Sequence, residues 1–121
     1  MSPKMECTEA TITIPVRNVA EAREWYERML GVPPELDPVP GIVEFRVGGT
    51  WLQLEEGQGG SNGWVFRFGV PSLESERSRL RDVGVAIGET ITVPGVIRFS
   101  DFKDPDGNVL SLYELLVSPK G

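Results

Sequence analysis

The sequence predicts an α+β fold made of two copies of a strand–helix–strands unit. Two stretches alternate apolar and polar residues, and each is followed by a helix-capping residue and an amphipathic segment. These stretches align with each other, ITIPVRNVAEAREWYERMLGV with FRFGVPSLESERSRLRDVGV, with Val16 and Val70 at matching positions. A glycine-rich run, residues 57–63, separates the halves and is interpreted as a linker.

The first half opens with a strand at residues 11–17, where isoleucine and valine alternate with threonine and proline. Asn18 is a good N-cap for a helix, and Gly31 supplies its C-terminal stop. The remaining elements expected in this half are a turn at residues 38–41 and a hairpin of strands 42–47 and 50–55 joined by Gly48-Gly49.

The second half repeats this order. Residues 64–70 alternate as a strand, Ser72 caps a second helix, and Gly84 ends it. The strands expected after the helix are 85–91, 96–102 and 109–116, with a turn at Asp104–Gly107 between the last two. We therefore expect one domain, residues 1–121, composed of modules 8–57 and 63–117 that pack or pair with each other, because one such unit buries little alone.

Length and charge exclude several classes of protein. The 121 residues carry 12 Lys and Arg against 18 Asp and Glu, a net charge of −6, which disfavours binding to nucleic acid or to an anionic membrane. No apolar run approaches the roughly 20 residues of a membrane span. The single cysteine makes the cytoplasm the simplest compartment.

The absence of histidine excludes further chemistry. Without it there is no Ser-His-Asp or Cys-His nucleophile, no histidine general base and no histidine metal ligand. With one cysteine as well, a metal would need mainly oxygen ligands, which favours Mg²⁺, Ca²⁺ or Mn²⁺.

Several fragments together resemble a known family. They are Val16–Val19, Trp25-Tyr26, Leu30-Gly31, Asp104–Asn108 and Leu110–Glu114. In this order and spacing, over roughly residues 8–117, they resemble the vicinal oxygen chelate superfamily, which includes glyoxalase I, bleomycin-resistance proteins and extradiol dioxygenases. The resemblance implies two βαβββ modules whose mixed sheets curl into a cup with helices outside. It also implies a small organic ligand in the cup and a homodimer that commonly completes the site.

The metal enzymes of that family hold their ion at four positions. Carried over by register, these positions are Thr11, Gln53, Val65 and Ser111. Valine cannot coordinate a metal ion, and threonine and serine are poor neutral donors. Because the family's ligands are missing, the resemblance implies no bound metal and no other cofactor.

Strand parity extends this set to a predicted inner face. The further ligand-contact candidates are Thr13, Glu44, Arg46, Trp51, Glu55, Arg67, Arg98 and Tyr113, with Ile97 and Phe99 expected on the opposite side. Two plainer interpretations remain open: the aromatic rings are sheet or dimer packing, and the arginines pair with Glu44 and Glu55 across strands.

These observations favour a metal-free small-molecule-binding protein, with drug sequestration as the family precedent and the acidic charge suited to a cationic drug. The alternative is a metal-independent isomerase or lyase that uses an inward Glu55 or Glu44, with a pKa raised by burial, as general base. A third interpretation is a degenerate module that mediates only protein contacts. The identity of the ligand and any exchange of modules in a dimer stay open.

Overall fold

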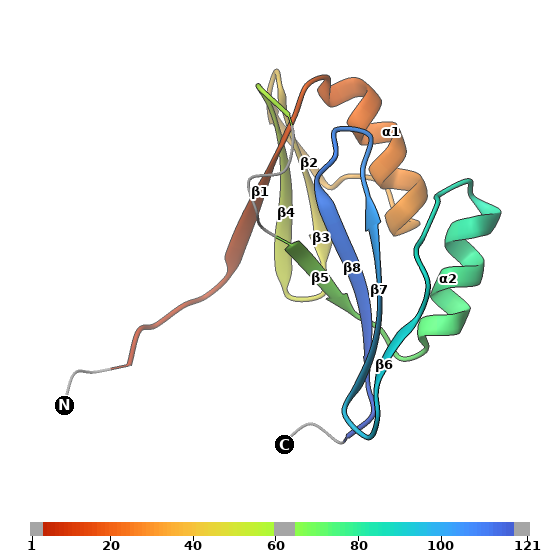
Figure 1. Ribbon diagram of the computed structural model, residues 1–121. Helices are drawn as coiled ribbons and strands as arrows, with labels where there is room; N and C mark the ends of the chain where they lie inside the picture. Colours follow the sequence, from red (N-terminus) through yellow and green to blue (C-terminus); the bar gives the residue numbers. More distant parts are fainter. Residues whose placement is uncertain (1–3, 60–64, 118–121) are drawn as a thin grey trace.

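The computed structural model describes residues 4–59 and 65–117, and these form two modules of the same element order (Figure 1). The first contains β1 (Ala10–Val16), α1 (Val19–Leu30), β2 (Leu36–Val39), β3 (Ile42–Val47) and β4 (Thr50–Glu56). The second contains β5 (Val65–Gly69), α2 (Leu73–Asp82), β6 (Ile91–Val93), β7 (Ile97–Lys103) and β8 (Val109–Leu115). The α+β class with two modules is confirmed.

Each module has its own four-stranded mixed sheet with the same topology. The strand orders are β1-β4-β3-β2 and β5-β8-β7-β6. In both, the first strand pairs in parallel with the last, and the remaining pairs are antiparallel. Strands β1 and β5 therefore each have one neighbour within their sheets, which leaves one edge of each open.

The helices begin where the sequence predicts. The Asn18 side chain accepts a hydrogen bond from the Glu21 N–H at 3.0 Å, and Ser72 accepts one from the Ser75 N–H at 3.3 Å. A carboxylate from the last strand of each module accepts a second hydrogen bond from the first residue of that module's helix. Glu56 accepts a hydrogen bond from the Val19 N–H at 3.0 Å, and Glu114 accepts one from the Leu73 N–H at 2.8 Å.

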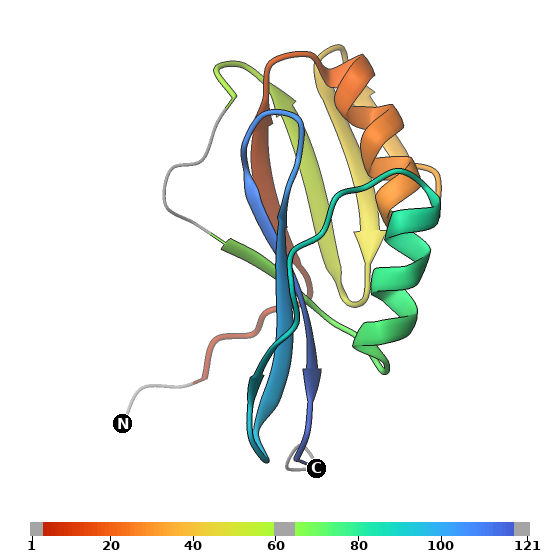
Figure 2. The same cartoon turned by 45° about the vertical axis from the view of Figure 1, so that its right-hand side comes forward.

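One hydrophobic core joins the two modules. It contains Tyr26 and Met29 of α1, Leu80 of α2, and the helix-facing side chains of both sheets, such as Phe45 and Leu110. Both helices lie on the same side of the molecule in two views (Figures 1 and 2). The opposite faces of the two sheets are consequently left free of helices. Within residues 4–59 and 65–117, no helix is long and apolar enough to cross a membrane.

The turn between β7 and β8 fastens the second module to the first. The buried Asp104 carboxylate accepts a hydrogen bond from the Tyr26 hydroxyl at 2.7 Å and from the Asn108 amide at 2.8 Å. The same amide donates to the Pro15 carbonyl at 2.9 Å. Burial, and secondly the charge of Asp104, raises the pKa of Tyr26 far above its ordinary value. The phenol is therefore a neutral donor in this junction.

Two short strands differ from the sequence prediction. The predicted strand 85–91 is wrong, because residues 85–90 contain only an isolated bridge from Ile87 to Phe102, and the strand β6 begins at Ile91. The sequence predicts only a turn at residues 38–41 and misses β2, because Pro38 breaks the alternation and the pairing with β3 is irregular. Residues 60–63 of the expected linker and Trp64 of the expected strand lie outside the described residues.

Candidate functional site

The free face of the first sheet carries seven of the predicted residues. Register places Thr11, Trp51 and Arg46 in one cross-strand row, and Thr13, Gln53 and Glu44 in the next. Glu55 follows in the third row and is exposed. Strand parity is right for this module, while the role of these residues as ligand contacts stays a prediction.

Hydrogen bonds within the middle row satisfy its polar groups. The Thr13 hydroxyl donates to Gln53 Oε1 at 2.8 Å, and Gln53 Nε2 donates to Glu44 Oε1 at 3.1 Å. Gln53 thus uses both its acceptor and its donor on neighbouring strands. A ligand that reached this row would have to replace these bonds.

The neighbouring row is occupied in a similar way. Trp51 Nε1 donates to Glu9 Oε2 at 3.0 Å, and Arg46 Nη1 lies 3.8 Å from the same oxygen. The Arg46 guanidinium also lies 4.8 Å from the centre of the Trp51 ring. The plainer interpretation paired this arginine with Glu44 or Glu55, whereas the structure pairs it with Glu9.

The free face of the second sheet is different in composition. Register places Arg67, Ser111 and Asp101 in one row and Gly69, Tyr113 and Phe99 in another. The remaining members of this face are Val65, Val109, Lys103, Ile97, Leu115, Ile91 and Val93. Exposed apolar residues on it include Ile91, Val93 and Leu115. Most of this face is apolar, with a few charged groups.

The predicted inward orientation of Arg98 is wrong. Arg98 pairs with Glu114 and Ser100 with Leu112, so both lie on the helix side of β7. There the guanidinium is 3.7 Å from Glu114 Oε2, and the Ser100 hydroxyl donates to the Gly88 carbonyl at 2.6 Å. The error was to assign the apolar Phe99 to the core, whereas it shares the free face with Tyr113.

Two ring contacts shape the second face. The Arg67 guanidinium lies 5.5 Å from the centre of the Phe99 ring. The Tyr113 ring lies over Gly69, since a Cβ on that glycine would be 3.0 Å from both Cζ and Oη of the tyrosine. The contacts of Phe99 with Arg67 and of Gly69 with Tyr113 could not be predicted from the sequence, because both depend on the register between β5, β7 and β8.

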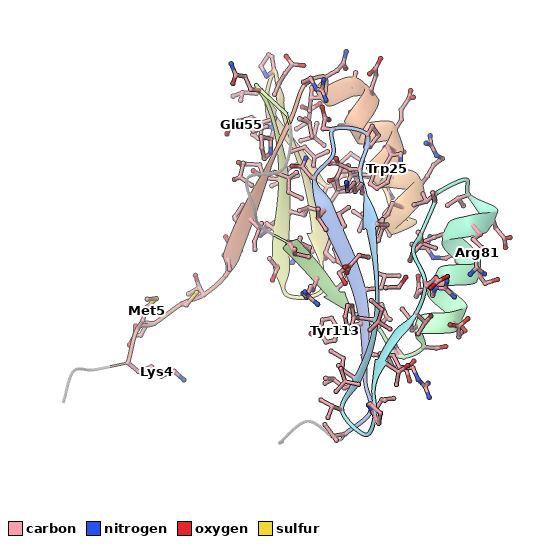
Figure 3. All side chains as sticks on the ribbon, in the orientation of Figure 1. Lys4, Met5, Trp25, Glu55, Arg81 and Tyr113 are labelled. Carbon is pink, nitrogen blue, oxygen red and sulfur yellow. The ribbon has the colours of Figure 1, made fainter. Side chains whose placement is uncertain are left out.

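A groove of about 340 Å³ lies between β1 and the starts of β5 and β8. Its lining comprises Thr11, Ile12, Thr13, Ile14, Pro15, Val65, Phe66, Asn108, Val109 and Leu110. Its volume is within the range of small-molecule sites. Of the predicted residues it brings together Thr11, Thr13 and Val65, while the others lie elsewhere on the two faces and Arg98 lies on the helix side. Figure 3 shows Glu55 and Tyr113, for example, well apart on different sheets.

The four positions that hold metal in the family's enzymes do not suit a divalent ion here. Val65 has no donor atom, Gln53 Oε1 already accepts from Thr13, and the fully buried Ser111 donates to the Ser100 carbonyl at 3.3 Å. In the described part of the chain no three His, Cys, Asp or Glu side chains cluster as ligands. A cation held by neutral oxygens alone would bind weakly.

The two-module fold points to a family, and a family model identifies it. The chain belongs to the Glyoxalase/Bleomycin resistance protein/Dioxygenase superfamily, whose family model matches residues 10–112. A comparison with curated proteins found no match.

Solved structures share the fold at low sequence identity. A glyoxalase/bleomycin resistance protein from Catenulispora acidiphila is 21% identical with a TM-score of 0.79, over 90% of this chain and 99% of that one. TnmS3, an antibiotic binding protein from a Streptomyces strain, is 22% identical with a TM-score of 0.73, over 93% and 99%. A lactoylglutathione lyase from Agrobacterium tumefaciens is 16% identical with a TM-score of 0.76, over 92% and 96%.

Proposed function

We propose that this protein binds a small organic molecule without a divalent metal, as in drug sequestration. The observation that carries the proposal is the groove, which contains two of the four positions carried over as metal ligands. It is lined there by Thr11 and Val65 rather than by charged ligands, and apolar residues such as Ile12 and Val109 make up much of the remaining lining. Such a surface favours burial of an apolar ligand over coordination of an ion. The similarity in fold to an antibiotic binding protein supports this function.

We further propose that a second copy of the chain completes the site. The two free faces belong to separate sheets, and each sheet has an open edge strand. Their charge balances are opposite: Glu44 and Glu55 outnumber Arg46 on the first face, and Arg67 and Lys103 outnumber Asp101 on the second. Pairing of the first face of one copy with the second face of another would enclose a cup. The single exposed cysteine is consistent with a cytoplasmic protein.

A thermal-shift screen of small organic acids, amines and neutral aromatic compounds tests the binding. A ligand at about 100 times its Kd stabilises the fold by about 2.7 kcal/mol. We expect at least one such ligand, with the same shift before and after treatment with EDTA. Val65→Arg, which places a long charged side chain in the groove, should abolish the shift.

Val96→Arg is the matched control, because Val96 is exposed outside the groove. It should retain the shift. Light scattering should give the mass of a dimer. A tightly bound divalent metal in stoichiometric amount, or the absence of any stabilising ligand, would overturn the proposal.

The catalytic alternative has no specific support in the described residues. Glu55 is exposed and so lacks the burial that the general-base hypothesis required. Glu44 accepts a hydrogen bond from Gln53. Glu55→Gln separates the two functions, because a general base is needed for turnover and not for binding.

A further inference from the structure

The second sheet's free face continues from the groove along two strands. Strand β5 presents Val65, Arg67 and Gly69 in turn, alongside Val109, Ser111 and Tyr113 of β8. Val65 and Val109 line the groove. Alternate residues of a strand are roughly 7 Å apart, so this face extends over the length of a small polycyclic molecule.

A second hollow lies at the far end of this face. It has a volume of about 310 Å³ and is lined by Gly69, Val70, Pro71, Tyr113, Glu114 and Leu115. Arg67 is the residue of β5 midway between the two hollows. A ligand that lies across the face from one hollow towards the other therefore passes the guanidinium.

Arg67 is positioned to receive an anion. Its guanidinium lies against the Phe99 ring, and an arginine stacked in this way keeps its in-plane N–H groups for a carboxylate. Among the described residues no carboxylate lies within ion-pair distance of Arg67, although Asp101 shares its row across Ser111. Lys103 adds a second positive charge to the face.

Tyr113 supplies a surface for a flat ligand. Because Gly69 has no side chain, the tyrosine ring lies down over the backbone of β5, and Phe99 is beside it on β7. Rings arranged beside a guanidinium favour a planar aromatic partner over a branched aliphatic one.

We infer that the ligand class is a planar aromatic carboxylate, with its rings against Tyr113 and Phe99 and its carboxylate on Arg67. This inference rests on the proposed function and specifies its ligand. It replaces the cationic ligand that the net charge of −6 suggested, because the charges on this face, rather than those of the whole chain, contact the ligand.

Calorimetric titration with three matched probes tests the ligand class. The probes are 2-naphthoate, neutral 2-naphthamide and cationic 2-naphthylmethylamine, which share one ring system and differ in charge. We expect 2-naphthoate to bind about tenfold or more tighter than the other two, as a charge-assisted hydrogen bond implies.

Two variants locate the site. Arg67→Gln should weaken 2-naphthoate by about tenfold or more, whereas Arg81→Gln, an exposed arginine of α2, should change it less than about twofold. Gly69→Ala forces the Tyr113 ring to move and should also weaken binding, whereas Gly49→Ala meets nothing within 4 Å and should not. Arg67 is exposed, so its variant should fold.

Equal binding of the three probes, or equal binding to wild type and Arg67→Gln, overturns this inference. So does failure of 2-naphthoate to bind at all. The proposed function is measured separately: a stabilising ligand of another class that is lost in Val65→Arg leaves that function standing while the aromatic carboxylate is rejected.

Discussion

The two sheets have the same topology, but their free faces differ in how far their polar side chains are hydrogen-bonded to one another. On the first, Thr13, Gln53 and Glu44 form a closed row of hydrogen bonds. On the second, Arg67 rests on Phe99, and apolar side chains remain exposed. The two modules therefore present one face with a row of mutually hydrogen-bonded side chains and one face with exposed apolar side chains and a stacked arginine.

This difference shows where binding energy is available. A ligand on the first face would exchange existing hydrogen bonds for new ones, with little net gain. On the second face it would bury apolar surface at about 25 cal/mol per Å² and pair a charged group. The groove lies between β1 of the first sheet and the starts of β5 and β8.

We expect the largest loss of unfolding free energy from a substitution in the turn between β7 and β8, which holds the two modules together. Asp104→Ala leaves the Tyr26 hydroxyl, the Asn108 amide and two backbone N–H groups without their acceptor. Urea unfolding should show a loss of about 2–4 kcal/mol. Asp101→Ala, at an exposed carboxylate, is the control and should stay within about 0.5 kcal/mol. Equal losses in the two variants would show that the junction contributes little.

The same junction should weaken in alkali. The raised pKa of Tyr26 means that folding favours its neutral form, so its contribution is complete below the unfolded value of about 10 and falls as the pH rises beyond it. Tyr26→Phe should lose about 1 kcal/mol at neutral pH and should decline less steeply than wild type from about pH 10 to 11. Parallel curves of unfolding free energy against pH would contradict this.

Matched substitutions on the two faces sharpen the comparison further. Gln53→Leu should cost about 1 kcal/mol of unfolding free energy, because Thr13 and Glu44 lose their partner. Arg67→Gln should cost less than about 0.5 kcal/mol, since its face is not held by such a row. If denaturant unfolding gives the reverse order, the assignment of a complete and an open face is wrong.

We expect the smallest change from a substitution beside α2, on the helix side of the second sheet. It is a control for the substitutions on the free faces. The hydrogen bond from the Thr90 hydroxyl, followed by the charge of Arg77, lowers the pKa of Glu74. Because its pKa is lowered by folding, Glu74 stabilises the fold at a pH above its pKa in the unfolded chain. This stabilisation is lost as the pH falls. Thr90→Val should raise the pKa of Glu74 towards normal in an NMR titration, with 2-naphthoate binding unchanged. An unaltered titration would remove the role of Thr90.

The sequence predicted those parts of the fold that depend on local chemistry. Asn18, Ser72 and Gly31 determine helix ends through their own side chains or backbone, so they could be recognised without neighbours. The family motifs predicted the two modules. Parity predicted the first free face, because apolar and polar residues alternate over residues 43–47 of β3 and 52–55 of β4.

What the sequence could not predict depends on pairing between distant strands. In β7 the apolar residues Ile97 and Phe99 lie on the free face, so a rule that places apolar residues in the core reversed the strand and misplaced Arg98. The contact of Tyr113 with Gly69 and the separation of the predicted cup into two faces follow from register and packing. Neither leaves a pattern in the sequence.

The proposed function requires that this member of the superfamily binds its ligand without a divalent ion. Calorimetric titration of EDTA-treated, dialysed protein with Mn²⁺, Ni²⁺ and Zn²⁺ tests it most directly. We predict no saturable binding at micromolar concentrations, because Thr11, Gln53, Val65 and Ser111 supply no charged donor. Saturation at one ion per chain with a micromolar or lower Kd would contradict the account.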